Sequence, residues 1–175
     1  MESRADIEKS VYIAKSLGFV PILVKGKIPL LKNWQNKTLE DCRTFKSAKP
    51  GINIGVLTGK PSGIIVLDIE HYEVEAWKNE LKDHPDFPKT LTVATGRKGL
   101  HIYFNYSEEV EKLKNAVKRP YDLKTSGGQC VFLYSRTENQ YLPIEGFSTK
   151  PNGEIIVDIA DMPQWLINKF LKQLK

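Results

Sequence analysis

The segment that most constrains this chain is residues 63–70, Gly-Ile-Ile-Val-Leu-Asp-Ile-Glu. Its four apolar residues, Ile64 to Leu67, run directly into Asp68 and Glu70. A continuous apolar run of this length predicts a strand buried on both faces. Because a strand has a period of two, both acids point to one face, where they repel each other unless a cation lies between them. The segment predicts either a divalent-metal site at the end of a core strand or a solvated strand end, and alone it leaves both open.

Length and composition indicate one globular domain. The chain has 175 residues, of which 41% are hydrophobic and 27% charged, and this is ordinary for a domain that buries its own core. Cys42 and Cys130 lie far apart without Cys or His at metal-ligand spacing, so we expect no zinc and a reducing compartment. No apolar run reaches the ~20 residues of a membrane helix, and the N-terminus does not resemble a secretion signal. We therefore expect a cytoplasmic protein with no membrane partner.

The elements around residues 63–70 are expected to alternate between helices and strands. Helical spacing predicts a helix over Ser3–Leu17, followed by a strand over Phe19–Val24. Ile52–Leu57 is a further strand, and the turn-rich stretch after it predicts a hairpin with the acid-bearing strand. A helix over Val74–Leu81 then suits a crossover to the next strand of the same sheet.

A second candidate stretch is the strand Leu100–Phe104, which follows a glycine-flanked basic loop at residues 95–99. Its apolar residues alternate toward the helices, so we expect His101 to lie on a polar face. Arg97 and Lys98 come just ahead of it. Several donors in this order suit contacts to a nucleoside triphosphate. A structural histidine is the alternative.

A third stretch, Tyr121 to Lys124, reads as a strand that runs into Gly127-Gly128. Asp122 and Lys124 share one face by the period of two. They predict either an ordinary surface pair or a third metal ligand with a phosphate contact. The glycines suit a hairpin, with residues 129–134 as the returning strand, or the close approach of a substrate.

Positive charge is concentrated in two places, although the net charge of +5 does not establish a polyanionic partner. The loop from Lys25 to Trp34 contains Lys27 and Lys32, and Lys118-Arg119 precedes the third stretch. Lysines beside an aromatic residue suit contacts to a nucleic acid, but they can also be merely solvated. For Trp34 we favour packing in the core.

In their order and content these stretches resemble the bifunctional primase–polymerase (prim-pol) family of the archaeo-eukaryotic primase superfamily. The likeness covers roughly residues 5–135 and extends upstream to residues 26–34 and 53–59. Lys124 stands where Arg is more usual, Leu133-Tyr134-Ser135 replaces a Pro-Pro-Ser, and the chain lacks ligands for the zinc-binding stem of some relatives. The matching motifs are Asp68 with Glu70, Gly99 to Phe104 with its His101, and Asp122 with Lys124 before Gly127-Gly128.

The resemblance implies a mixed α/β (α+β) fold. An RRM-like palm sheet flanked by helices would carry the active site, with an N-terminal α/β unit beside it. Residues 1–175 would form a single catalytic domain, either alone or as the N-terminal part of a longer replication protein with a helicase partner. The candidate site is expected to be a surface of the sheet, with the 63–70 strand supplying one edge.

The resemblance further implies template-dependent nucleotidyl transfer, as a DNA primase, a DNA polymerase or both, by a two-metal mechanism. The partners would be single-stranded DNA template and dNTPs or NTPs, in prokaryotic, plasmid, phage or viral replication. Two Mg²⁺ or Mn²⁺ ions would be held by Asp68, Glu70 and Asp122. Triphosphate contacts would come from His101, Lys124, Arg97, Lys98 and Ser126, and template contacts from Lys27, Lys32, Lys118 and Arg119.

Two other functions stay open on the residues alone. Asp122-x-Lys124 with an upstream acid loosely resembles the pattern of restriction-type nucleases, so a metal-dependent nuclease is the first alternative. It leaves His101 without a role, and the interval from Asp68 is long for that pattern. The second alternative is a catalytically silent nucleic-acid-binding module, whose binding would depend neither on Asp68 nor on metal.

Overall fold

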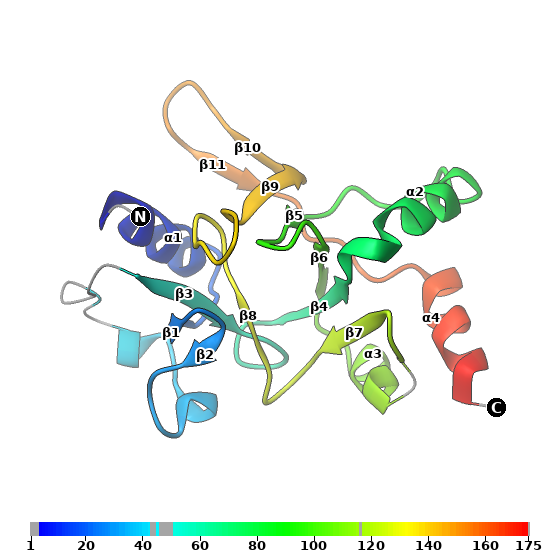
Figure 1. Ribbon diagram of the computed structural model, residues 1–175, viewed down its shortest axis with the longest axis horizontal. Helices are drawn as coiled ribbons and strands as arrows, with labels where there is room; N and C mark the ends of the chain where they lie inside the picture. Colours follow the sequence, from blue (N-terminus) through cyan, green and yellow to red (C-terminus); the bar gives the residue numbers. More distant parts are fainter. Residues whose placement is uncertain (1–3, 43–44, 46–50, 116, 175) are drawn as a thin grey trace.

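Two antiparallel sheets share one hydrophobic core in the structure, a computed structural model that describes residues 4–42, 45, 51–115 and 117–174. We call them the N-terminal sheet and the palm sheet. In Figure 1 the N-terminal sheet lies to the left of the palm sheet, and α2 and α4 lie to the right. The N-terminal sheet has the order β2 (Ile28–Pro29), β1 (Pro21–Lys25), β3 (Ile52–Leu57), β8 (Gln129–Val131). The palm sheet has the order β7 (Tyr121–Lys124), β4 (Ile64–Ile69), β6 (Leu100–Asn105), β5 (Thr92–Ala94), β9 (Leu142–Glu145).

The palm sheet is built by a β-α-β-β-α-β run, β4-α2-β5-β6-α3-β7, with α2 at Val74–Lys82 and α3 at Glu108–Glu111. Its strands lie in the order β7-β4-β6-β5, which is the RRM-like arrangement. Strands β4 and β5 are parallel because each is antiparallel to β6, which lies between them. The predicted crossover through α2 and the mixed α+β fold class are therefore both confirmed.

The two faces of the palm sheet follow from its period-two alternation. One face packs against the helices, where Trp77 of α2 is fully buried beside Phe87 and Trp165. The other face packs against the N-terminal sheet and the helix α1 (Arg4–Ser16). The helix-facing strand residues are Ile65, Leu67, Ile69, Leu100, Ile102, Phe104 and Leu123. The core facing the N-terminal sheet contains Ile64, Val66, Val93 and Tyr103.

The predicted hairpin between residues 52–57 and the acid-bearing strand is wrong. Strand β3 belongs to the N-terminal sheet and β4 to the palm sheet, and between them Gly59 and Ile64 form only an isolated bridge. A side chain at Gly59 would lie 2.2 Å from Ser126, because the chain passes close by on its way back to the N-terminal sheet. Residues 129–131 likewise return to that sheet instead of pairing with β7.

The two chain crossings between the sheets are held together by hydrogen bonds. Thr58 N donates to Gly128 O at 3.1 Å, and Thr58 Oγ1 donates to Thr125 O at 2.7 Å. Glycine and polar turn residues suit a crossing as well as a hairpin, so local sequence did not separate the two. Strand β4 is buried, so its backbone groups need a hydrogen-bonding strand along each edge, which β6 and β7 supply.

The remaining elements cover the edges of the two sheets. Helix α4 (Gln164–Leu171) buries Leu166, Ile167 and Phe170 against the palm sheet. The sequence prediction missed the short strands β2 and β9, and it missed β10 (Phe147–Thr149) as the partner of β11 (Ile155–Val157). The 3₁₀ turns are Trp34–Asn36, Glu40–Cys42, His71–Glu73, Lys112–Asn115 and Lys172–Leu174.

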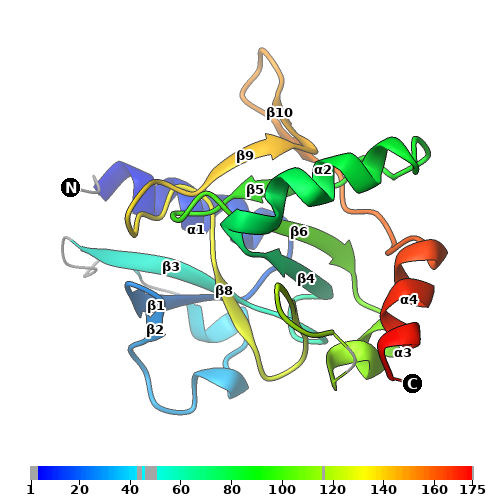
Figure 2. The same cartoon turned by 45° about the vertical axis from the view of Figure 1, so that its right-hand side comes forward.

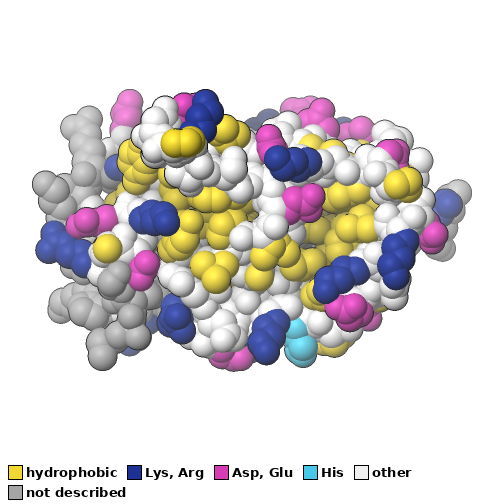
Figure 3. Space-filling view, turned by 90° about the horizontal axis from the view of Figure 1, so that it is seen from above, with side chains coloured by type: hydrophobic (Ala, Val, Ile, Leu, Met, Phe, Trp, Pro, Cys, Tyr) yellow, Lys and Arg dark blue, Asp and Glu magenta, His cyan; other side chains and the backbone are white. Residues whose placement is uncertain are grey.

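The view from above shows hydrophobic side chains gathered between groups of charged ones (Figure 3). Large exposed hydrophobic side chains on the strands β9 and β11 are Leu142, Ile144 and Ile156. None of the described helices combines the length and the apolar character that a membrane crossing would require.

Candidate active site

The acid-bearing strand lies in the middle of the candidate site. Asp68 pairs in register with His101 of β6 on one side and with Asp122 of β7 on the other. Since all three residues lie in one row across adjacent strands, their side chains emerge on the same face. The expectation that this strand supplies only one edge of the site is therefore wrong. Strand β4 is flanked on both sides.

Cations surround the Asp68 carboxylate. His101 Nε2 lies 3.6 Å from Asp68 Oδ1, and Lys124 Nζ lies 3.7 Å from Asp68 Oδ2. Lys124 comes from the next row of β7, opposite Val66, and its ammonium also forms an ion pair with Asp122. One ammonium therefore lies between two carboxylates that the strand register places side by side.

A polar cavity of about 410 Å³ opens over the two carboxylates of this row. All three predicted metal ligands line it, and so do Lys124, Lys27 from the turn between β1 and β2, and Arg119. Glu70 reaches this cavity from just beyond the end of β4, where its N–H donates to Pro120 O at 3.2 Å. We call this space the carboxylate cavity.

A smaller cavity of about 160 Å³ adjoins the carboxylate cavity, and we call it the histidine cavity. Asp68, Lys124 and Lys27 line both cavities, which makes them neighbours around one site. The histidine cavity is also lined by His101 of the palm sheet and by residues that come after the three motifs in the chain. Its other lining residues are His101, Gln129, Cys130, Val131 and Tyr141.

The charges at the centre of the site reinforce one another. Burial on its own would lower the pKa of His101, but its hydrogen bond to Asp68 and its contact with Cys130 raise that pKa to about 9. Burial would raise the pKa of Asp68, yet the hydrogen bond and charge of His101, with Lys124 and Lys27, hold it below its usual value. In the same way, Asp122 raises the pKa of Lys124 against the effect of burial. The raised pKa of His101 and the lowered pKa of Asp68 favour a protonated histidine beside an ionised carboxylate.

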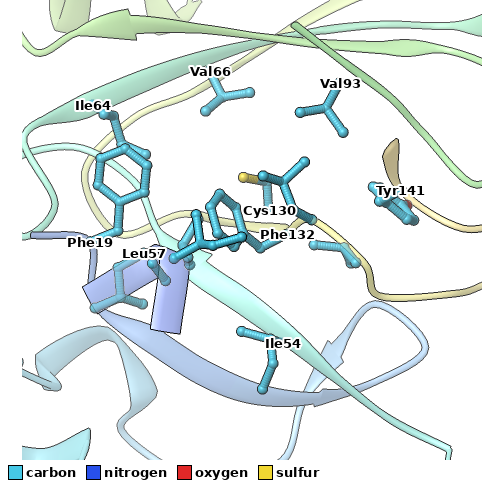
Figure 4. Packing of buried hydrophobic residues seen from close by; sticks show 14 of the residues in the cluster. Phe19, Ile54, Leu57, Ile64, Val66, Val93, Cys130, Phe132 and Tyr141 are labelled. Atoms are coloured by element: carbon cyan, nitrogen blue, oxygen red, sulfur yellow. The ribbon is translucent and has the colours of Figure 1, made fainter. Parts of the chain in front are cut away.

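The sequence predicted that His101 lies on a polar face. In the structure, the N-terminal sheet covers His101 instead. His101 is buried, and its neighbour on that face, Tyr103, contacts Cys130 Sγ at 3.4 Å through its hydroxyl. Figure 4 shows Cys130 among hydrophobic side chains of the shared core, with Val66 and Phe132 close by. In Figure 2 the segment carrying β8 passes beside β4 between the two sheets. This covering strand makes the histidine cavity a pocket instead of an open surface.

Several predicted contacts lie outside both cavities. Arg97 is exposed and forms an ion pair with Glu138 at 2.7 Å, and Lys98 beside it is also exposed. Ser126 accepts a hydrogen bond from Lys60 N and lines a separate cavity with Tyr106 and Glu111.

The predicted template residues are spread around the site. Lys27 and Arg119 line the carboxylate cavity, as described above. Lys118 is exposed next to Arg119, and Lys32 lies in a separate groove formed by residues 28–35. Trp34 is partly buried against the core, as expected.

Sequence reasoning missed Gln129, Cys130 and Tyr141. Gln129 Nε2 donates to Lys27 O at 2.9 Å and so fixes the turn that carries this lysine into the site. Tyr141 lies beside His101, with 5.7 Å between the ring centroids. The signal for Gln129 and Cys130 was present as residues directly after the Gly-Gly turn, but nothing local indicated the sheet to which they return.

The donor set fits a hard divalent cation in its chemistry. Asp68, Glu70 and Asp122 supply only carboxylate oxygens, which Mg²⁺ and Mn²⁺ prefer, in a polar cavity open to solvent. Within the described ranges, however, no three side chains of His, Cys, Asp or Glu lie close enough together to hold an ion. The Lys124 ammonium takes the position between Asp68 and Asp122, so this lysine has to move before both can share a metal.

The RRM-like order of the sheet places the chain in the class of α+β domains with a palm-like sheet. Residues 10–165 match the family described as bifunctional DNA primase/polymerase, N-terminal (Prim-Pol), and the chain belongs to this family. Family membership makes it a nucleotidyltransferase-type enzyme that acts on DNA and nucleotides. No curated protein matches the chain.

Proposed function

We propose that this domain transfers nucleotides to a growing strand under the direction of a single-stranded DNA template, as a primase, a polymerase or both. The observation that carries the proposal is the row His101–Asp68–Asp122, in which the two carboxylates line the carboxylate cavity and His101 lines the adjoining histidine cavity, with Asp68 shared by both. Nucleotidyl transfer needs both features, because carboxylates hold divalent ions while cations hold the incoming triphosphate.

We assign Asp68, Glu70 and Asp122 to the binding of two Mg²⁺ or Mn²⁺ ions. Such ions, when bound, lower the pKa of an attacking 3′-hydroxyl and neutralise the triphosphate. Asp68 suits this role because it is already ionised and only 29% exposed, so it is desolvated and oriented by His101. Glu70 and Asp122 approach the same cavity from the end of β4 and from β7.

We assign His101 and Lys124 to the triphosphate. Both are cationic at neutral pH, and both line the histidine cavity beside Asp68. A point-charge ammonium at Lys124 can follow a phosphate as it moves, whereas an arginine at this position would give planar, bidentate contact. Because Arg97, Lys98 and Ser126 line neither cavity, the proposed phosphate contacts are restricted to His101 and Lys124.

We assign Lys27 and Arg119 to the nucleic-acid backbone at the site, with Lys32 and Lys118 farther out. Lys27 and Arg119 lie on the carboxylate cavity, where a template or primer phosphate would approach the acids. Each lysine or arginine that neutralises a phosphate releases counterions, so binding should weaken as salt rises.

The decisive experiment is primer extension and primer synthesis by an Asp68→Ala variant on single-stranded template, with dNTPs or NTPs and with Mg²⁺ or Mn²⁺. We expect incorporation to fall at least about a hundredfold, because loss of a direct metal ligand should cost no less than loss of a supporting residue. Asp86→Ala, at an exposed loop position, is the matched control and should retain full incorporation. Full incorporation by a folded Asp68→Ala protein would sink the proposal.

The same assay separates the two alternatives. A nuclease would shorten a labelled strand in metal without any nucleoside triphosphate. A silent binding module would retain DNA affinity in EDTA and in the Asp68→Ala variant, without incorporation in either protein.

A further inference from the structure

The two carboxylates at the centre of the site are unfavourably placed without a cation. Asp68 and Asp122 are directly opposite each other on adjacent antiparallel strands. Like charges in such a pair destabilise a sheet. The side chain of Asp68 is only 29% exposed, so water screens this repulsion incompletely. A cation between the two carboxylates therefore stabilises this part of the sheet.

Lys124 supplies that cation. Its Nζ forms an ion pair with Asp122 Oδ2 and lies 3.7 Å from Asp68 Oδ2. The Lys124 side chain is 28% exposed, whereas Lys78 in its ion pair with Glu75 is 58% exposed. Lys124 also lines the histidine cavity, so a change of rotamer can carry its ammonium from the carboxylates toward His101. A lysine stem has the freedom for this movement.

We propose that Lys124 is an exchangeable internal cation: its ammonium holds the place between Asp68 and Asp122 in the metal-free protein and leaves it when a divalent ion binds. This inference rests on the proposed function in taking Mg²⁺ or Mn²⁺ as the ligand of these carboxylates. It goes further by assigning Lys124 two positions, one between the acids and one toward the histidine cavity.

The exchange of Lys124 couples the binding of a divalent ion to the binding of a nucleotide. A divalent ion that binds alone has to displace Lys124 and leave the ammonium without its carboxylates. A triphosphate in the histidine cavity would accept that ammonium, so nucleotide should strengthen metal binding. By thermodynamic reciprocity, metal should strengthen nucleotide binding by the same factor.

The test is Mn²⁺ binding without nucleotide, measured from the electron paramagnetic resonance signal of free Mn²⁺. We expect Lys124→Gln to bind Mn²⁺ roughly three- to tenfold more tightly than wild type, because no ion pair has to be broken. Lys124→Arg keeps the positive charge and should not bind more tightly. Lys78→Gln removes one positive charge from an exposed ion pair with Glu75 outside both cavities, and should change affinity less than about twofold.

Thermal unfolding gives a second measurement on the same proteins. In EDTA, Lys124→Gln should melt below wild type, since Asp68 and Asp122 then face each other without a cation. Saturating Mn²⁺ should remove most of this difference, because the bound ion replaces the missing ammonium.

A third measurement needs no variant. Brief acetylation of wild-type protein, read by mass spectrometry, should modify Lys124 faster in Mg²⁺ than in EDTA, whereas modification of Lys78 should not change. The inference is overturned if Lys124 reactivity is unchanged, or if Lys124→Gln binds Mn²⁺ no more tightly than wild type. In either case the proposed function still stands as long as the wild-type protein incorporates nucleotides. If wild type and variant both fail to bind Mn²⁺, the metal assignment fails as well.

Discussion

At the scale of single residues, Asp68 is distinguished by its neighbours. A lone carboxylate that is this desolvated would favour its neutral form. His101, Lys124 and Lys27 reverse that preference, and the Asp68 pKa is lowered instead. The same pairing raises the pKa of His101 to about 9 although this imidazole is buried. His101 therefore stabilises the ionised form of Asp68 even without a bound nucleotide.

This pairing predicts a pH-dependent stability in the metal-free protein. The groups that face His101 are Asp68 of β4, Cys130 of β8 and Tyr141. Because the folded-state pKa of about 9 lies above the unfolded value near 6.5, the stabilisation is complete below about pH 6.5 and is lost as pH rises through 9. We expect the difference in unfolding free energy between wild type and His101→Gln, measured by urea denaturation in EDTA, to shrink between about pH 6.5 and pH 9. A difference that stays constant over this range would contradict the assignment of His101 as a cation.

At the scale of elements, the register of β4 with β6 sets the distance between Asp68 and His101. The pairing runs from Ile64 with Asn105 to Ile69 with Leu100, without a shift. Just before β6, Gly99 allows the chain to lie against the end of β4, where an added Cβ would be 2.4 Å from Ile69 O. Gly99 O also accepts from Thr95 N at 2.9 Å, which closes the loop that carries Arg97 and Lys98.

We therefore predict that Gly99→Ala separates the ends of β4 and β6. Incorporation should fall at least about tenfold, since a small misplacement of reacting groups is costly. Unfolding free energy should fall by about 1–3 kcal/mol, because the methyl group meets backbone that cannot move aside cheaply. Primer extension and urea denaturation measure the two effects.

The control for this variant is Gly153→Ala. Gly153 has φ +85° and nothing near its Cβ position, so alanine there meets only backbone strain of about 1 kcal/mol. It should leave incorporation unchanged. Wild-type activity in Gly99→Ala would mean that the close approach at Gly99 does not position His101.

At the scale of the whole molecule, the site is assembled from both sheets. The palm sheet provides the acids and the histidine, while the N-terminal sheet provides β8 and the turn that carries Lys27. The two sheets meet through Phe132, which is fully buried and packs edge-on against Phe19 and Tyr103. Stability and the shape of the histidine cavity should therefore change together.

We predict that Phe132→Ala lowers the unfolding free energy by about 3–5 kcal/mol, the usual cost of a cavity of this size in a core. It should also weaken nucleotide binding, measured as a raised KM for dNTP, because β8 loses its support over the histidine cavity. Ile144→Ala, at a side chain that is 59% exposed, should change stability by less than about 0.5 kcal/mol. A large loss of stability with an unchanged KM for dNTP would mean that packing at Phe132 does not shape the histidine cavity.

The sequence by itself determined which residues share a face. The period of two is a local property of a strand, so Asp68, His101 and the Asp122–Lys124 pair could each be assigned to one side of a strand before any pairing was known. The same local signals, with the resemblance to the primase–polymerase family, predicted the RRM-like palm sheet, its crossover helix and the order of its motifs. The face assignments and the crossover helix depended on neighbours within a few positions in the chain, whereas the palm sheet was implied by the family resemblance.

Only the tertiary structure decided how the strands pair and what covers the site. Glycine-rich turns at residues 58–63 and 125–128 are compatible with hairpins, yet both carry the chain from one sheet to the other. Whether such a turn forms a hairpin or a crossing depends on which segments pack against β4. Those segments are far apart in the sequence. For the same reason the burial of His101, the Lys124 ammonium between two acids and the closing of the cavity by Gln129 and Cys130 had no local signal. Strand β4 is thus the centre of the candidate site, because β6 and β7 on either side of it supply the partners of Asp68.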